Sequence, residues 1–374
     1  VPEIRYTSQK KNRYGENRLR ADGLLEYPCR TLASLFSPAI FYGEKLSSIR
    51  KIIKQKIQEE FARNSLIRTI PQQGRNNARL VLTLMKILDG KLVENLTGLY
   101  VPSNALDVMT DIAIASPAVC AYRQSGNEED AQMVAKAVVS VFNKPESAAV
   151  IDLMYNKKND DDYYESVLDY CAIGNLQAVL DEYLYMAPED KKLGQVVTDA
   201  IIGTSNLSID TTDSLGKEEK KQLMRCHFAI PFIDKTVTDK SVTRTTNIRK
   251  AFNSPFRPFL LSTTSIGQEG LDFHWYARKI VHWNLPSNPV DLEQREGRIN
   301  RFKCLAIRRN VVKLYASETY HTWDELFSMA YSNLKGMHSD IVPYWCLPVA
   351  ELTEEQRAKL EYIERIVPLY PLSR

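Results

Sequence analysis

Residues 279–301 read KIVHWNLPSNPVDLEQREGRINR. The first seven are mostly apolar and indicate a short strand. Asn288 then offers a helix N-cap and Pro289 suits the first helical position, so a helix is expected directly after the strand. The preceding stretch FLLSTTSIGQEGLDF, residues 259–273, opens with an apolar run typical of a buried parallel strand. Strands that alternate with helices predict a parallel α/β sheet.

Polar residues recur along the expected helix, with Gln294, Arg298 and Arg301 at spacings of four and three. This spacing predicts that they share one helical face. Arginines grouped beside a strand-end loop suit bidentate contact with phosphate, and we interpret Arg298 and Arg301 as catalytic residues that stabilise a transferring γ-phosphoryl group. The alternative is a surface helix whose arginines form salt bridges with Glu293 and Glu296.

The loop at 262–273 combines small hydroxyl residues with Gly267 and Gly270. In open α/β sheets, ligands bind just past the carboxyl ends of strands. Glycines allow close approach of the backbone, and exposed amides and hydroxyl groups bind phosphate. Asp272 follows, placed to accept hydrogen bonds from a sugar hydroxyl. The loop therefore predicts a nucleotide site.

The rest of the chain reads as helical before about residue 220 and as alternating strands and helices after it. Apolar residues at helical spacing predict helices over 46–61, 80–88, 105–123, 129–142, 146–155 and 163–187. Further strands are expected at 227–233 and 310–316, and a helical connector at 242–254. Capping boxes at Thr322 and Thr353 predict two more helices.

Composition narrows the function classes. The chain has 374 residues with 49 basic and 46 acidic side chains, so bulk charge does not indicate a nucleic-acid partner. Its six cysteines include no CxxC pair, which favours neither a metal site nor a disulfide framework. Without a signal peptide or an apolar run of about 20 residues, we expect a cytoplasmic protein with no membrane partner.

The two motif regions resemble a known family. FLLSTTSIGQEGLDF looks like motif V, and Gln294-x-x-Gly297-Arg298-x-x-Arg301 looks like motif VI, of the superfamily-two helicases and translocases. The run LPSNP at 285–289 followed by LEQREGRINR at 292–301 is similar to the bacterial RapA-like branch of the Swi/Snf-type ATPases. The resemblance covers about residues 225–316.

The resemblance implies roles for individual residues. Thr264 and Ser265 would contact nucleic acid, and Gly270 and Asp272 would face the nucleotide, with Asp272 near the ribose. Gln294 would couple the nucleotide site to the nucleic-acid site. Arg298 and Arg301 would be the catalytic, phosphate-sensing pair. The chain continues with Phe302-Lys303-Cys304 where the remodelling enzymes usually have Ile-Gly-Gln, which favours a divergent bacterial or phage branch.

A motor of this type also needs a first lobe with a phosphate-binding Walker A loop and an Asp-Glu pair that holds magnesium. No Walker A motif is found. Asp181-Glu182 imitates the acidic pair but lies in a helically patterned stretch, and no phosphate loop precedes it. We therefore expect ATP and Mg²⁺ to be bound mainly by a first lobe outside this sequence, and the chain alone to be inactive.

Several other residues allow two interpretations. His274 and His282 lie beside the motifs without a third ligand at metal spacing, which favours packing or hydrogen-bonding roles. Lys303, Arg308 and Arg309 follow motif VI and form either a phosphate-contacting strip or a solvated loop.

These observations predict a linker and mostly helical region at 1–195, a RecA-like parallel sheet flanked by helices at 196–335, and a helical tail at 336–374. The expected function is the C-terminal part of an ATP-dependent nucleic-acid translocase or helicase, with duplex DNA as the expected form. Its first lobe would lie in the same longer chain or in a partner chain. The alternative is a catalytically inactive binding or scaffold module.

Overall fold

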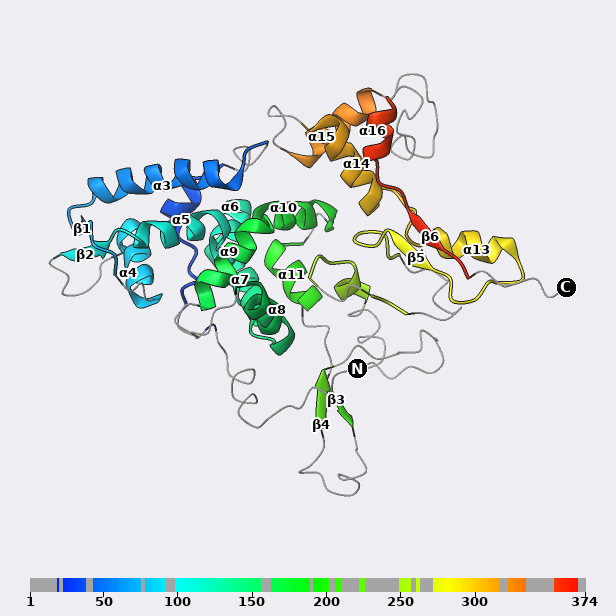
Figure 1. Cartoon of the computed structure of the whole chain (residues 1–374), viewed down its shortest axis with the longest axis horizontal. Helices are drawn as coiled ribbons and strands as arrows, with labels where there is room; N and C mark the ends of the chain where they lie inside the picture. The colour runs from blue at the N-terminus through cyan, green and yellow to red at the C-terminus, as the bar shows by residue number, and fades with distance from the viewer. Residues whose placement is uncertain are drawn as a thin grey trace. The chain divides into compact units, whose positions relative to one another are not determined.

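The computed structural model describes residues 19, 23–37, 43–74, 78–91, 98–155, 163–188, 191–201, 206–209, 222–225, 249–256, 260–262, 272–316, 322–333 and 353–368. The chain divides into two compact units, Val1–Thr198 and Asp199–Arg374. Figure 1 labels the helices and strands of both. The three expected domains, 1–195, 196–335 and 336–374, stay a prediction.

The first unit is built mainly from helices. They are α2 (Arg30–Ser34), α3 (Leu46–Arg63), α4 (Ala78–Leu88), α5 (Ala105–Ala115), α6 (Pro117–Ser125), α7 (Glu128–Phe142), α8 (Pro145–Tyr155), α9 (Tyr163–Ile173), α10 (Leu176–Met186) and α11 (Leu193–Ile201). Two short strands, β1 (Ile67–Ile70) and β2 (Leu99–Pro102), pair in parallel.

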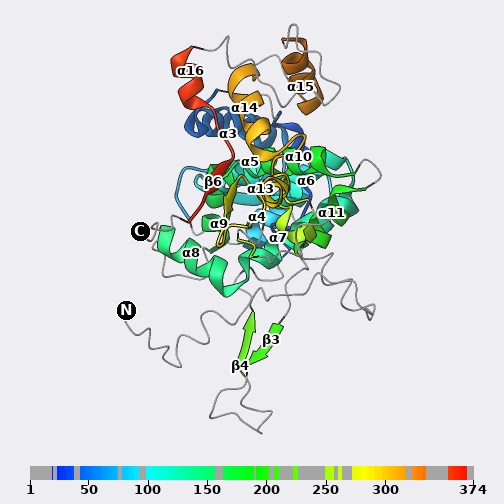
Figure 2. The same ribbon diagram turned by 90° about the vertical axis from the view of Figure 1, so that its right-hand side faces the viewer.

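The core of this unit forms where apolar faces at helical spacing meet. Helix α3 buries Ile49, Ile53, Ile57 and Phe61, as the spacing predicts, and packs on α5. Helix α5 is buried along most of its length, and α6 packs closely against α7. Figures 1 and 2 show α5, α6, α7 and α10 gathered into one bundle.

Two of the expected helices are each divided in two. The stretch 105–123 breaks before Pro117, which has no N–H to donate and occupies the first turn of α6. The stretch 163–187 breaks at Gly174-Asn175. Asn175 adopts a left-handed conformation with φ of 47°, and its side chain accepts a hydrogen bond from Ala178 N to begin α10. Proline at one break and a capping asparagine at the other therefore override the apolar spacing.

Over the described ranges, no single helix is long and apolar enough to cross a membrane. Helices α5 and α6 pass the test of length and composition only as a pair bent by 44°.

The second unit combines short strands with helices. Its strands are β3 (Asn206–Ile209), β4 (Gln222–Arg225), β5 (Lys279–Val281) and β6 (Glu364–Ile366), and its helices are α13 (Pro289–Glu296), α14 (Leu305–Tyr315), α15 (Trp323–Ser332) and α16 (Glu354–Lys359). β3 and β4 pair antiparallel, and β5 and β6 pair in parallel. Of this parallel pair, β5 lies where the sheet is expected, whereas β6 lies in the stretch 336–374 that is expected to be helical.

Sequence patterns in the second unit were right at some elements and wrong at others. The strand expected at 279–285 is confirmed over Lys279–Val281, and the capping box at Thr322 begins α15. The strand expected at 310–316 is wrong, because those residues continue helix α14, whose buried side includes Leu305, Arg308 and Val311. These buried residues are three apart, which is the spacing of a helical face, and the short apolar run at 310–316 did not reveal it.

The strand expected at 258–263 is also not formed where it is described. Residues 260–262 have no regular structure, and Leu260 is 79% exposed. The strand expected at 227–233 lies outside the described residues. The connector expected at 242–254 is helical over 249–252. The helix expected after Thr353 is the short α16, and the chain then turns into β6.

Candidate functional site

Helix α13 begins as the sequence predicts. Asn288 is its N-cap, and its side-chain Oδ1 accepts a hydrogen bond from Val290 N at 3.0 Å, with Pro289 in the first turn. Asp291 places a negative charge in that turn, where it interacts favourably with the positive end of the helix dipole. The helix buries none of its residues, so its polar side chains face outward.

The helix ends before the two arginines, so the prediction of one shared helical face is wrong. Gly297 caps the helix and donates to Glu293 O at 2.8 Å, and the chain then turns through 297–300. Arg298 O accepts a hydrogen bond from Phe273 N at 3.0 Å, which ties this turn to the segment after the expected nucleotide loop. Gly297 also has little spare room, since a β-carbon there would lie 3.3 Å from Glu293 O.

Arg301 and Asp272 are brought together by this turn. Arg301 Nη1 lies 2.9 Å from Asp272 Oδ1, and Arg301 Nε donates to Gly297 O at 3.0 Å. The backbone of Asp272 is held in turn by Asn253 Nδ2, which donates to its carbonyl at 2.6 Å. Both side chains of the ion pair are partly exposed, at 41% and 32%. One carboxylate oxygen of Asp272, expected near a ribose, is therefore bound by Arg301.

Arg298 is in a different state. Its Nε is buried and has no hydrogen-bond partner, and the guanidinium forms no ion pair with any described residue. A buried N–H without an acceptor costs about 1–3 kcal/mol, so native proteins rarely leave one without a reason. Arg298 thus has one buried N–H that no acceptor among the described residues satisfies.

The other expected site residues are only partly placed. Gln294 lies exposed on α13. Gly270, Thr264 and Ser265 lie outside the described residues, so their roles stay predictions.

His274 lies next to the ion pair and is held neutral. Burial is the main cause that lowers its pKa to about 4; Asp272 opposes this shift, and the positive charges of Arg301, Arg308 and Arg249 add to it. Its Nδ1 is buried without a hydrogen-bond partner among the described residues. The site therefore keeps its positive charge on arginines and adds none from this histidine at neutral pH.

Neither expected interpretation holds for Arg308. The side chain is fully buried, and it donates to Trp275 O and to Lys303 O, each at 2.6 Å. Its guanidinium also lies over the Tyr276 ring, 5.3 Å from the centroid. Arg308 therefore joins α14 to the segment beside Asp272, and it belongs neither to a solvated loop nor to a phosphate-contacting strip.

The acidic pair in the first unit is helical, as expected. Asp181 and Glu182 lie in α10, and Asp181 Oδ1 accepts a hydrogen bond from Gln177 Nε2 at 2.8 Å. Burial raises the pKa of Asp181 to about 6, against the lowering effects of Gln177 and Arg123. No group of three or more metal-binding side chains occurs in the part of the chain that the structure describes.

The first unit also has a polar pocket of about 560 Å³ between α3, α5 and α9. Its charges satisfy one another: Arg50 pairs with Asp111 at 2.8 Å and with Asp169, and Lys54 pairs with Asp107 at 2.6 Å. These pairs fix α3 on the bundle.

A comparison with protein families matches residues 203–303 to the helicase conserved C-terminal domain. The matched segment contains α13, Asp272 and both arginines of the turn. The match supports a helicase-family C-terminal module, the C-terminal lobe of a superfamily-two helicase with a RecA-like fold. No curated protein and no solved structure matches the chain.

Proposed function

We propose that the chain supplies the second RecA-like lobe of an ATP-dependent duplex-DNA translocase or helicase of the bacterial RapA-like type, working in the cytoplasm. A first lobe, in the same longer protein or in a partner, binds ATP and Mg²⁺. The turn after α13 supplies the arginines that meet the γ-phosphate.

The observation that carries this proposal is the contrast between the two arginines. Arg301 is held by Asp272 and by Gly297 O, whereas Arg298 Nε is buried without an acceptor. A phosphate oxygen is the acceptor that a planar guanidinium binds best. The residues present therefore fit a nucleotide phosphate, which arrives with the other lobe.

The two arginines then have separate tasks. Arg298 makes the direct contact with the phosphoryl group, and its bonds strengthen as negative charge develops there. Arg301, fixed at both ends of its guanidinium, keeps the turn in shape and adds positive potential. His274 remains neutral beside them, because its pKa is lowered to about 4. The positive charge that meets the phosphate therefore comes from the two arginines.

Arg298→Ala tests the proposal in the assembled enzyme, formed by this chain and its ATP-binding lobe. Loss of an arginine finger lowers kcat by about 10³-fold or more, and KM changes far less. Lys restores little, because it lacks the bidentate fork. The melting temperature stays near that of the wild type, because Arg298 forms no ion pair with any residue that the structure describes. A kcat within about threefold of the wild type would instead favour an inactive binding or scaffold module.

A further inference from the structure

Residues 353–368, which we call the strap, include strand β6, and this strand pairs with β5 although the two are far apart in the sequence. Glu364 pairs with Lys279 and Ile366 with Val281 in parallel register. Two further backbone bonds flank the pair, from Glu364 N to Arg278 O and from His282 N to Ile366 O, both at 2.9 Å. The strap is thus joined to the strand that leads into α13.

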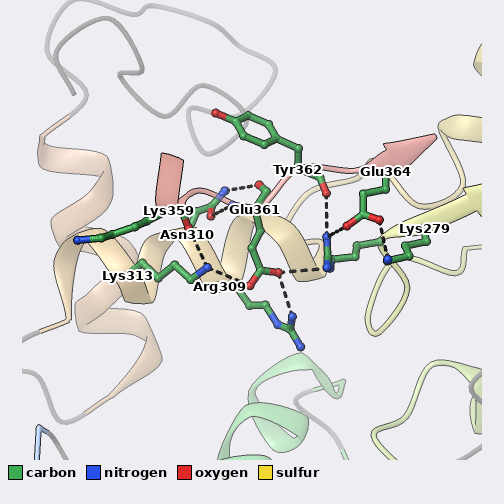
Figure 3. A network of polar contacts seen from close by, with 9 residues as sticks. Lys279, Arg309, Asn310, Lys313, Lys359, Glu361, Tyr362 and Glu364 are labelled. Atoms are coloured by element: carbon green, nitrogen blue, oxygen red, sulfur yellow. Dashed lines mark hydrogen bonds and ion pairs between the residues drawn. The ribbon is translucent and has the colours of Figure 1, made fainter. Parts of the chain in front are cut away.

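A dense polar network holds the strap in place (Figure 3). The carboxylate of Glu361 lies 2.9 Å from Arg309 and 3.0 Å from Lys313. Asn310 exchanges two hydrogen bonds with the backbone of Glu361, both at 2.7 Å. Glu364 pairs with Lys279 at 2.6 Å. So many contacts to α14 and β5 define one position for the strap.

The strap also reaches the end of α13. Arg365 Nη1 lies 3.1 Å from Glu296 Oε1. His282 Nε2 lies 3.5 Å from the same oxygen but has no hydrogen-bond partner among the described residues. Glu296 is the last residue of the helix, and its side chain is the point that the strap contacts.

Glu296 continues this connection into the arginine turn. Its backbone carbonyl accepts hydrogen bonds from Ile299 N at 3.1 Å and from Asn300 N at 3.0 Å. These two bonds enclose Arg298. A residue held by its side chain from the strap therefore holds, by its backbone, the loop that carries the unpaired guanidinium.

We propose that the strap is a positioning element for Arg298, acting through the contact between Arg365 and Glu296. The catalytic role of Arg298 in this inference rests on the proposed function. The connection from Arg365 through Glu296 to the turn at Arg298 does not depend on that function. Without the Arg365 contact, the end of α13 and its turn gain freedom, and Arg298 spends less time where a phosphate can meet it. Displacements of about 1 Å at such a group reduce rates by up to about 10²-fold.

Arg365→Ala separates positioning from folding, because the contact is a surface one, with Arg365 55% and Glu296 25% exposed. Such pairs contribute little to overall stability. In the assembled enzyme we expect kcat to fall about tenfold with KM for ATP nearly unchanged, and Arg365→Lys to recover most of the loss. Lys359→Ala is the matched control, since Lys359 lies on the strap but its ammonium pairs with Glu355.

Hydrogen exchange on this chain alone supplies the second readout. The amides of Ile299 and Asn300 should exchange several-fold faster in Arg365→Ala and at the wild-type rate in Lys359→Ala. Unchanged exchange in both variants, or a kcat within about twofold of wild type while Arg298→Ala is inactive, would overturn the positioning role. Faster exchange together with an active Arg298→Ala variant would keep the connection and refute the proposed function instead.

Discussion

Arg301 and Asp272 form an ion pair at 2.9 Å, and Gly297 O holds the Nε of the same arginine at 3.0 Å. This pairing joins the segment after the expected nucleotide loop to the turn after α13. It also gives Asp272 a second candidate role, since the family resemblance places this residue near a ribose. A carboxylate that fixes an arginine and one that binds a sugar hydroxyl give different results when they are removed.

Asp272→Asn should lower kcat of the assembled enzyme about tenfold, because Arg301 loses its charged partner and the turn loses one of its anchors. A ribose role would instead raise KM for ATP and abolish any preference for ATP over 2′-deoxy-ATP. Comparing kcat and KM for the two nucleotides distinguishes these cases. Glu293→Gln, an exposed carboxylate on α13, serves as the control. A raised KM with unchanged kcat would favour the ribose.

Binding to duplex DNA should be weak, independent of sequence and sensitive to salt. The expected contact at Thr264 is to a phosphate, and no base-reading motif is present, so the backbone supplies the affinity. Affinity should fall by about tenfold or more between 50 and 200 mM salt, because binding releases condensed counterions and this release is less favourable at higher salt. Titration of several duplexes of different sequence checks this, and binding that ignores salt or prefers one sequence strongly would contradict it.

The sequence predicted what local patterns determine. Asn288 and Pro289 begin α13, Thr322 caps α15, and the apolar spacing of α3 buries the expected residues. It failed where the deciding partner is distant or where a single residue ends an element. Gly297 stops α13 before Arg298, and no periodicity reveals this.

The contacts of the site show the same limit more clearly. Both members of the Asp272–Arg301 pair were candidates, but their contact depends on the turn after Gly297. The contact between Glu296 and Arg365 is not predicted: the sequence suggests Glu296 only as a partner for arginines of its own helix, because 68 residues of chain separate it from Arg365 and surface charges have no pattern of their own. Arg308 was read as a surface cation, since burial of an arginine depends on carbonyl groups that tertiary structure supplies.

Asp181 should make stability depend on pH. Burial raises its folded pKa to about 6 from the ordinary value of 3.8, so the folded state binds its proton more tightly than the unfolded state does. The stabilisation is therefore fully present below about pH 4 and is lost as pH rises through about 6. Asp181→Asn should flatten this decline in melting temperature. Glu182→Gln, the neighbouring control, should leave it in place, and an equal effect of both variants would refute the assignment.

Arg308 and Arg309 give the sharpest contrast between neighbours. Arg308 is fully buried and satisfies two carbonyl groups, one of them on Lys303, which adopts a left-handed conformation with φ of 54°. Arg308→Met keeps much of the side-chain volume but removes the two hydrogen bonds that Arg308 donates to these carbonyl groups. We expect the free energy of unfolding to fall by about 3 kcal/mol or more.

Arg309 is 49% exposed and pairs with Glu361 at 2.9 Å. Arg309→Met should therefore cost about 1 kcal/mol or less, since one exposed pair contributes little and Lys313 still contacts the same carboxylate. Urea denaturation, followed by a probe in the second unit, compares the two variants directly. A contrary result would be that Arg308→Met matches Arg309→Met in stability and weakens binding to duplex DNA. That result would make Arg308 a phosphate contact and would contradict its buried position. The expected result is the reverse: stability falls markedly in Arg308→Met alone, because that variant loses a fully buried guanidinium and its two hydrogen bonds to carbonyl groups.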